Sequence, residues 1–289
     1  MRSLDSLSNF YSMDYAPLIS RDVDDPVPLL GALFGAMRRA GYRYDQVSLG
    51  PLDPESPRYG QLIAALRGQG YRAFVSFRIG NWFEPIGGRS FDAYMSGRPS
   101  VLRNTLQRRR KRLTKSADAR ITIITGGEQL EDAIRDYQAA YALSWKEPEI
   151  FPHFIPDLVR ASAQLGCLRL GLLYIDNVPA AAQIWLISGS SAVIYKLAYD
   201  PRFQEFSVGS LLTEHLMRWV IERDHVKEVN YGSGDDPYKK EWMSCRREWI
   251  GVAAYNARSV RGMAQILAEQ GRRLVKTVTQ RASDGGSPP

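Results

Sequence analysis

The hydrophobic positions of the first hundred residues alternate between helical and strand-like spacing. Helical patterns cover 29–41 and 61–70 and each ends at a glycine, while strand patterns cover 44–52 and 71–85. Helices and strands that alternate along the chain are typical of an α/β unit. The pattern therefore predicts such a unit over residues 1–97, and its shortness indicates a partial one.

A strongly basic segment comes next. Residues 98–115 contain eight Lys or Arg and no acid. At about 100° per residue, Leu102, Leu106 and Leu113 lie along one stripe of a helix, and Arg109 falls beside that stripe. We expect an amphipathic basic helix with one arginine leaning inward.

The pattern after residue 118 indicates a fuller domain. The expected elements, in chain order, are a strand at 119–125, helices at 128–145 and 152–166, three strands within 167–200, a helix at 211–224, a strand at 226–234, a short helix at 236–243 and a strand at 247–257. Hairpin turns at Asp176-Asn177 and Gly189-Ser190 predict that the three strands form an antiparallel meander. The fold class is therefore α/β (mixed α+β), with its main domain at 98–257.

Composition and charge restrict the class of protein and the kinds of binding partner. The chain has 289 residues, 44% hydrophobic and 24% charged, which excludes a disordered or fibrous protein. Its net charge of +7 comes from the eight bases of 98–115 and a net +4 in 256–289, and the rest carries −5. No aromatic residue is interleaved with the bases of 98–115, so stacking on single-stranded nucleic acid is unsupported. We expect no DNA partner, and we expect tRNA to be a minor alternative.

The C-terminal segment, 258–289, reads as a basic amphipathic helix followed by a tail. One apolar stripe of the helix at 258–278 contains Val260, Met263, Leu267, Leu274 and Val278. Such a stripe suits packing on the protein or a reversible contact with anionic lipid. The closing RASDGGSPP is polar and rich in Gly and Pro, so we expect it to be disordered.

The compartment signals favour the cytoplasm. Cys167 and Cys245 are too few for a disulfide framework. The N-terminal residues lack the pattern of a signal peptide, and no apolar run is long enough to span a bilayer. We expect a cytoplasmic protein, with membrane contact limited to the inner face.

Three segments carry a resemblance to a known family. They are RPSVLRNTLQRRRKRL, YDPRFQEFSVGSLLTEHLMRWVIERD and YGSGDDPYKKEW. They resemble the GNAT-superfamily acetyltransferases of the cellulose and exopolysaccharide biosynthesis type, which are related to the Fem peptidyltransferases with their two GNAT-like units. The resemblance covers about 98–256. It implies an acyl-CoA-dependent N- or O-acyltransferase, most simply an acetyltransferase, acting on a sugar or peptide acceptor of envelope or exopolysaccharide metabolism.

The same resemblance places acetyl-CoA, or another acyl-CoA, at the turn before the 211–224 helix. A helix that begins after small residues presents free N–H groups to a phosphate. GNAT enzymes use Gln/Arg-x-x-Gly-x-Gly/Ala here, whereas this chain has FQEFSVGSL, with Gly209 and Ser210 as the small residues. The strand at 194–200 could pair with the pantetheine amides. The expected cofactor-binding residues are Lys196, Leu197, Tyr199, Ser207, Val208, Gly209, Ser210, Leu211 and Lys239.

Tyr238 and Asp236 are the expected catalytic residues. Tyr238 stands where GNAT enzymes often place a tyrosine general acid, and packing is the competing interpretation. Asp236 could act as a base, but an Asp before Pro is equally a helix N-cap. Arg109 and Asp235 are the expected substrate-binding residues.

Other chemistries find little support in the sequence. His153, His215 and His225 have no metal-ligand spacing, so no metal is expected. Lys196 could instead protect a strand edge, and Lys239 could be a solvated lysine. Two alternatives to the acyl-CoA enzyme remain open: a Fem-like aminoacyl-tRNA-dependent peptidyltransferase, and a GNAT-fold scaffold without activity.

Overall fold

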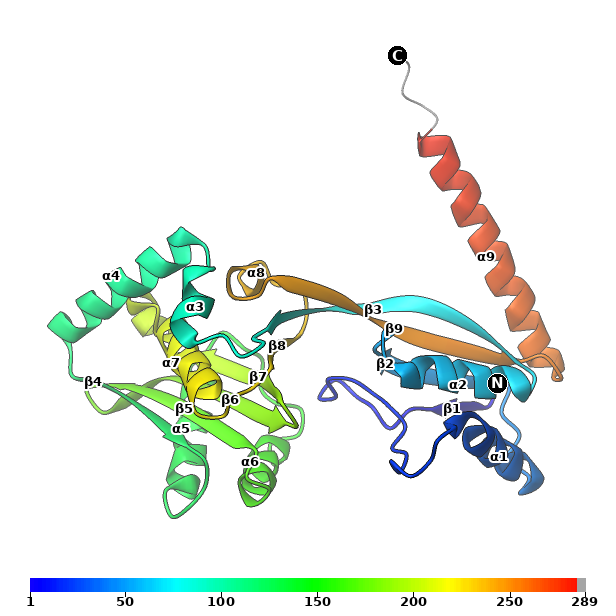
Figure 1. Cartoon of the computed structure of the whole chain (residues 1–289), viewed down its shortest axis with the longest axis horizontal. Coiled ribbons are helices and arrows are strands. Elements are labelled where there is room, and N and C mark those ends of the chain that lie inside the picture. Colours follow the sequence, from blue (N-terminus) through cyan, green and yellow to red (C-terminus); the bar gives the residue numbers. More distant parts are fainter. Residues whose placement is uncertain (285–289) are drawn as a thin grey trace. The chain divides into compact units, whose positions relative to one another are not determined.

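The computed structural model describes residues 1–284, with side chains through residue 275 (Figure 1). Its contacts divide the chain into a central unit, Asn81–Arg247, and a terminal unit, Met1–Gly80 together with Glu248 onward. These bounds differ from the expected ones at 98 and 258. The physical reason is that two long strands, β3 (Tyr71–Pro85) and β9 (Cys245–Asn256), run through the division, so both ends of the chain build one unit.

The terminal unit contains four strands and three helices. Its sheet has the order β1-β2-β9-β3, with β1 (Ser3–Asp5) parallel to β2 (Gln46–Leu52) and β2 antiparallel to β9. Asp25 caps α1 (Pro26–Arg39) and Ser56 caps α2 (Pro57–Gly68), each just before a proline in the first helical position. Helix α9 (Val260–Asp284) ends the described chain.

The central unit contains a six-stranded sheet with the order β3-β8-β7-β6-β5-β4. Strands β4 (Ala119–Ile124), β5 (Leu168–Ile175), β6 (Val178–Ser188) and β7 (Ser191–Tyr199) form the expected antiparallel meander, and β8 (Glu228–Ser233) joins β7 in parallel. The left-handed residues Asp176 and Asn177 make the first hairpin turn, and Gly189 makes the second. The mixed α/β fold class is confirmed.

Helices cover both faces of this sheet (Figure 1). On one face lie α3 (Phe91–Ser96), α4 (Ser100–Ser116) and α7 (Val208–Glu222), and on the other lie α5 (Leu130–Ala142) and α6 (Phe154–Gln164). Gly171 of β5 faces α7, because a β-carbon built there would lie 2.7 Å from the Leu216 side chain. The hydroxyl of Tyr174 donates to Asp136 of α5 at 2.5 Å, so α5 packs on the opposite face of the sheet. The two helical layers thus sandwich the meander.

Several local features differ from the expectation. The sequence pattern missed α3, β1 and a short 3-10 helix, η1 (Pro201–Phe206). Each has six residues or fewer, which is too short to show a periodic hydrophobic pattern. The tail expected from residue 281 is partly wrong, since α9 extends through Asp284, and residues 285–289 lie outside the described chain. Within residues 1–284, no helix combines the length and apolar character that a bilayer crossing requires.

Candidate functional site

Strands β7 and β8 separate after a short paired stretch. Their parallel register joins Ser191–Val193 to Glu228–Asn230. In the described chain that register goes no further, although β7 continues to Tyr199 and β8 to Ser233. Beyond Val193, the side of β7 that faced β8 is therefore a strand edge inside the sheet, where an extended ligand with amide groups could pair.

A tight turn leads from the end of β7 into α7. Ser207 has a left-handed backbone with φ 53°, and no side chain in the described chain caps the first turn of α7. The turn reads Gln204-x-x-Ser207-x-Gly209, so Ser207 occupies the first glycine position of the GNAT turn and adopts a conformation that favours glycine. The uncapped N–H groups of Val208, Gly209 and Ser210 make this end of α7 suited to an anion.

Packing holds the turn close to the strand. A β-carbon built at Gly209 would lie 3.3 Å from Cδ1 of Tyr199. The Gly209 carbonyl accepts hydrogen bonds from Gln183 Nε2 at 2.9 Å and from Thr213 Oγ1 at 3.0 Å. Gln183 and Thr213 are buried, and neither was expected from the sequence, since a polar residue inside a strand or helix has no motif to mark it.

Helix α4 holds the turn from the other side. The guanidinium of Arg109 donates to the Glu205 carbonyl of η1 at 2.5 Å, and Arg112 forms an ion pair with the Glu205 carboxylate. Arg109 is half-buried, as the helical stripe predicted. Its contact is the backbone of the turn, whereas the sequence suggested a substrate. The basic helix therefore positions the segment that precedes α7.

The three β7 residues that were expected to bind the cofactor contact different parts of the unit. Lys196 forms an ion pair with Glu149 at 2.6 Å, and both side chains are largely buried. The ring of Tyr199 packs against Trp145, with ring centroids 4.5 Å apart. Leu197 packs against the hydrophobic core. Of these three residues, Tyr199 is the one that the structure brings to the α7 turn.

The loop after β8 is held by two charge pairs. Asp235 accepts hydrogen bonds from Arg246 at 2.7 Å and from the indole N–H of Trp82 at 3.0 Å, and the Arg246 bond is the main cause that lowers its pKa. Lys239 is buried, donates to the Ser233 carbonyl at 2.6 Å and pairs with Asp236 at 3.2 Å. Burial lowers the pKa of Lys239, and Asp236 opposes that shift. Lys239 thus stabilises the loop, which differs from the phosphate contact expected of it.

Tyr238 lies at the start of α8 (Lys239–Trp242) and is 41% exposed. Its ring meets the buried Tyr231 edge-on, with centroids 5.5 Å apart. Burial, followed by the charge of Asp236, raises the pKa of Tyr238 to about 12. The N-cap of α8 is Tyr238 itself, so the interpretation of Asp236 as a helix cap is wrong. Its carboxylate is 56% exposed and pairs with Lys239.

A lysine that the sequence analysis missed lies near Lys196 and Asp236. Lys146, in the loop between α5 and α6, has its pKa lowered by burial and then by the charge of Lys196, while Glu149 and Asp236 oppose the shift. Its ammonium lies 5.8 Å from the ring centre of Trp145. The loop therefore brings an amine and an aromatic ring beside Tyr199. No motif marks these residues, because the loop meets β7 only in the folded sheet.

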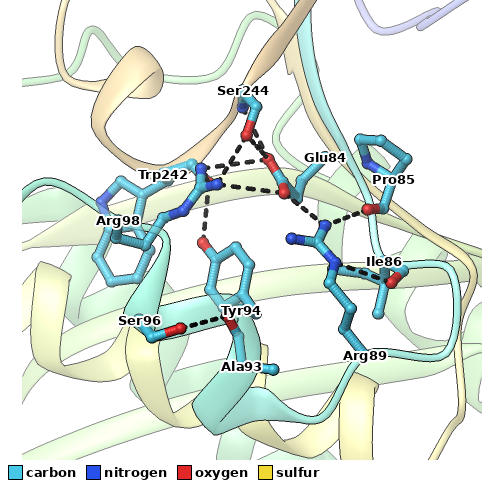
Figure 2. A network of polar contacts seen from close by, with 10 residues as sticks. All are labelled: Glu84, Pro85, Ile86, Arg89, Ala93, Tyr94, Ser96, Arg98, Trp242 and Ser244. Atoms are coloured by element: carbon cyan, nitrogen blue, oxygen red, sulfur yellow. Dashed lines mark hydrogen bonds and ion pairs between the residues drawn. The ribbon is translucent and has the colours of Figure 1, made fainter.

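A buried carboxylate anchors the C-terminal end of α8 (Figure 2). Glu84 accepts hydrogen bonds from Arg89 at 2.6 Å and from the Ser244 amide at 2.7 Å, and Arg98 pairs with it at 3.1 Å. Burial raises the pKa of Glu84, but the bonds from Ser244 and Arg89 and the charge of Arg98 outweigh it and leave the pKa below its usual value. Arg98 and Tyr94 also donate to the Trp242 carbonyl, at 2.9 and 2.8 Å. The network fixes the segment that carries Tyr238.

Among the residues described, no group of three His, Cys, Asp or Glu could hold a metal ion.

Comparisons with known proteins agree with this geometry. Residues 100–240 match the family model of an acetyltransferase (GNAT) domain. A search of curated proteins found no match. This match covers just under half of the chain, so the central unit is similar to a GNAT acetyltransferase domain.

Three solved structures share the fold of the chain. The FemX crystal structure has a TM-score of 0.60 and 12% identity, covering 84% of this chain and 88% of that one. The C-terminal domain of a lysylphosphatidylglycerol synthetase from Agrobacterium fabrum has a TM-score of 0.54 and 14% identity, covering 89% and 84%. The Bacillus licheniformis L-PGS structure has a TM-score of 0.50 and 13% identity, covering 86% and 80%.

Proposed function

We propose that the central unit transfers an acyl group, most simply acetyl, from an acyl-CoA to an amine or hydroxyl of a sugar or peptide in envelope or exopolysaccharide metabolism. The observation that carries the proposal is the divergence of β7 from β8 toward the uncapped N-terminus of α7. The edge of β7 beyond its pairing with β8 suits the amides of pantetheine, and the helix end suits the pyrophosphate. Both features lie within the residues that match the GNAT family model.

The side chains of the loop after β8 support a direct transfer. The acceptor nitrogen or oxygen forms a bond to the thioester carbonyl carbon, and the carbon–sulfur bond breaks. The Asp236 carboxylate, 56% exposed, takes the acceptor's proton directly or through a water. Because the pKa of Tyr238 is about 12, its hydroxyl stays neutral and donates a hydrogen bond to the leaving sulfur. Transfer occurs in one ternary complex without an enzyme-bound acyl group.

A second candidate function has its own supporting observation. The exposed face of α4 presents Arg103, Arg108, Lys111 and Lys115, with no acid anywhere on the helix. Such a face suits a polyanionic donor, since cations along a helix can follow the phosphates of RNA. The resemblance to the Fem peptidyltransferases implies an aminoacyl-tRNA donor. We rank it second, because the edge of β7 beyond Val193 has no role in that reaction.

Calorimetry of the full chain distinguishes the two donors. Acetyl-CoA, desulfo-CoA and aminoacyl-tRNA are titrated separately into the wild type and into Gly209→Glu. A carboxylate at position 209 occupies the helix end and repels phosphate, and it also crowds Tyr199. We therefore expect acetyl-CoA and desulfo-CoA to bind the wild type and to lose measurable affinity for the variant.

The matched control is Val101→Glu, which places a glutamate on the exposed first turn of α4. It should leave acetyl-CoA binding unchanged. Binding of aminoacyl-tRNA alone would reject the proposal in favour of the second candidate. Binding of neither donor would indicate a scaffold that keeps the fold.

A further inference from the structure

Helix α9 leaves a long apolar stripe uncovered. Val260, Leu267 and Leu274 are 90%, 62% and 69% exposed, and they recur every seven residues along one side of the helix. Met263 and Val275 flank them and are exposed as well. Figure 1 shows α9 as one uninterrupted helix. Exposed large apolar residues are ordinary when scattered, but a continuous stripe marks a contact surface.

A different side of α9 holds the helix to its own unit. Ile266 is buried, and Arg273 donates to the Val75 carbonyl of β3 at 3.0 Å and packs on Phe74. At 100° per residue, Ile266 and Arg273 lie about 100° away from Leu267 and Leu274. The stripe is therefore separate from the side of α9 that packs on the terminal unit.

The basic residues of α9 lie on other sides of the helix than the stripe. Residues 256–289 contain six bases and two acids. One of those acids, Glu269, pairs with Arg272 at 2.6 Å and with Arg273 at 3.4 Å. Pairing α9 with a second copy would bring like charges together with few acids to balance them. An anionic surface supplies the missing opposite charge.

A cavity at the N-terminal end of α9 also favours an anionic ligand. It measures about 360 Å³ and lies among Asn256, Arg258 and Ser259 of the chain that enters the helix. Arg2, Arg38 and Arg43 also line it, and its one acid is Asp45. The carboxylate of Asp45 accepts a backbone hydrogen bond from Arg2 at 3.0 Å, which lowers its pKa. Four arginines among the residues that line a cavity of this size suit a phosphate-bearing headgroup.

We propose that the terminal unit binds the surface of an anionic phospholipid membrane, with the α9 stripe in the interface and the arginine-lined cavity taking headgroup phosphate. The proposal concerns where the protein works and does not depend on its acyl donor. Apolar contact and charge act together in such binding, because neither one alone holds a protein stably at a membrane.

Vesicle flotation of the full chain tests the proposal without any acyl donor. The vesicles are pure phosphatidylcholine, or phosphatidylcholine with an equal share of phosphatidylglycerol. We expect the wild type to float with the anionic vesicles only, and to be released by high salt. Leu267→Glu/Leu274→Glu should lose at least tenfold in binding. Arg38→Gln/Arg43→Gln should lose about fivefold for each base removed, if each is worth the usual contribution near an anionic surface.

The matched control for the stripe is Leu165→Glu, since Leu165 is 80% exposed at the end of α6 in the central unit. It should bind vesicles as the wild type does. Circular dichroism and acetyl-CoA calorimetry on every variant show whether the fold and the donor site are intact.

Three outcomes would overturn the proposal. They are a wild type that ignores anionic vesicles, a stripe variant that binds as well as the wild type, and equal binding to both kinds of vesicle. A wild-type dimer that Leu267→Glu/Leu274→Glu converts to a monomer, without vesicle binding, would assign the stripe to a second copy of the chain.

Discussion

Most charged side chains near the α7 turn act on the protein itself. Lys239 donates to the carbonyls at the end of β8, Arg109 donates to the carbonyl of Glu205, and Lys196 neutralises Glu149. Buried or half-buried cations need such partners, because an unpaired charge inside a protein is costly. In the proposed reaction, the exposed Asp236 carboxylate meets the acceptor and the Tyr238 hydroxyl meets the leaving sulfur.

Glu84 gives the sharpest stability prediction. Glu84→Gln leaves Arg98 buried without its negative partner, so we expect about 3 kcal/mol less free energy of unfolding at pH 7. The pKa of Glu84 lies below its usual 4.5 in the folded state, so the carboxylate stabilises the fold above about pH 4.5. That contribution disappears as the pH falls through the folded pKa. Urea denaturation at pH 7 and pH 3.5 should therefore show a large difference that shrinks in acid.

The control for this experiment is Glu128→Gln, an exposed glutamate that should change the unfolding free energy by less than about 0.5 kcal/mol. A difference between Glu84→Gln and the wild type that stays constant down to pH 3.5 would contradict the role of the ionised carboxylate.

Tyr238 gives the sharpest catalytic prediction, and it rests on the proposed function. Tyr238→Phe should lower turnover by roughly 10- to 100-fold while the affinity for acyl-CoA changes little, because the hydroxyl acts on the leaving sulfur. Since the pKa of Tyr238 is about 12, the wild-type rate should show no alkaline decline from this group below about pH 11. Steady-state rates across pH measure both effects. Tyr42→Phe, an exposed tyrosine of the terminal unit, is the control; an equal loss there would argue against a specific role.

At the scale of elements, α4 stabilises the turn that precedes α7. It contacts η1 through Arg109 and Arg112, and η1 leads directly into α7. A loop that must present backbone N–H groups to a ligand binds best when it is already ordered. In the proposed function, the basic helix thus contributes to donor binding from a distance.

Two neighbouring arginines separate this role from direct binding of a polyanion. Arg109→Met removes the bond to the Glu205 carbonyl and should weaken acyl-CoA binding about fivefold, from the loss of about 1 kcal/mol. Arg108→Met removes an exposed charge and should have no effect on acyl-CoA. Calorimetry at two salt concentrations measures both variants. If Arg108→Met weakened binding of a nucleic-acid donor and reduced its salt dependence, the second candidate function would gain support.

At the scale of the whole molecule, the unit boundaries predict which fragments fold. A fragment of residues 81–247 keeps Glu84, the buried Phe91 and Tyr94, and the central core, so it should unfold cooperatively. A fragment of residues 98–257, the domain that the sequence pattern favours, loses these residues. It also keeps the β9 segment from Glu248 on without its partner β2. We expect that second fragment to aggregate or to melt without a transition.

Thermal melts followed by circular dichroism, together with limited proteolysis of the full chain, check this prediction. Proteolytic cuts that release a stable 98–257 fragment would contradict the boundaries at 81 and 247.

The sequence by itself determined the antiparallel meander, the inward lean of Arg109 and the small-residue turn before α7. Each depends on spacing or on a few adjacent residues, so local pattern suffices. Only the tertiary structure decided the partners of Lys196, Lys239 and Asp235, the bracing of η1 by α4, and the union of both chain ends in one unit. These depend on residues far apart in the chain that meet when strands pair, and no local pattern encodes that meeting.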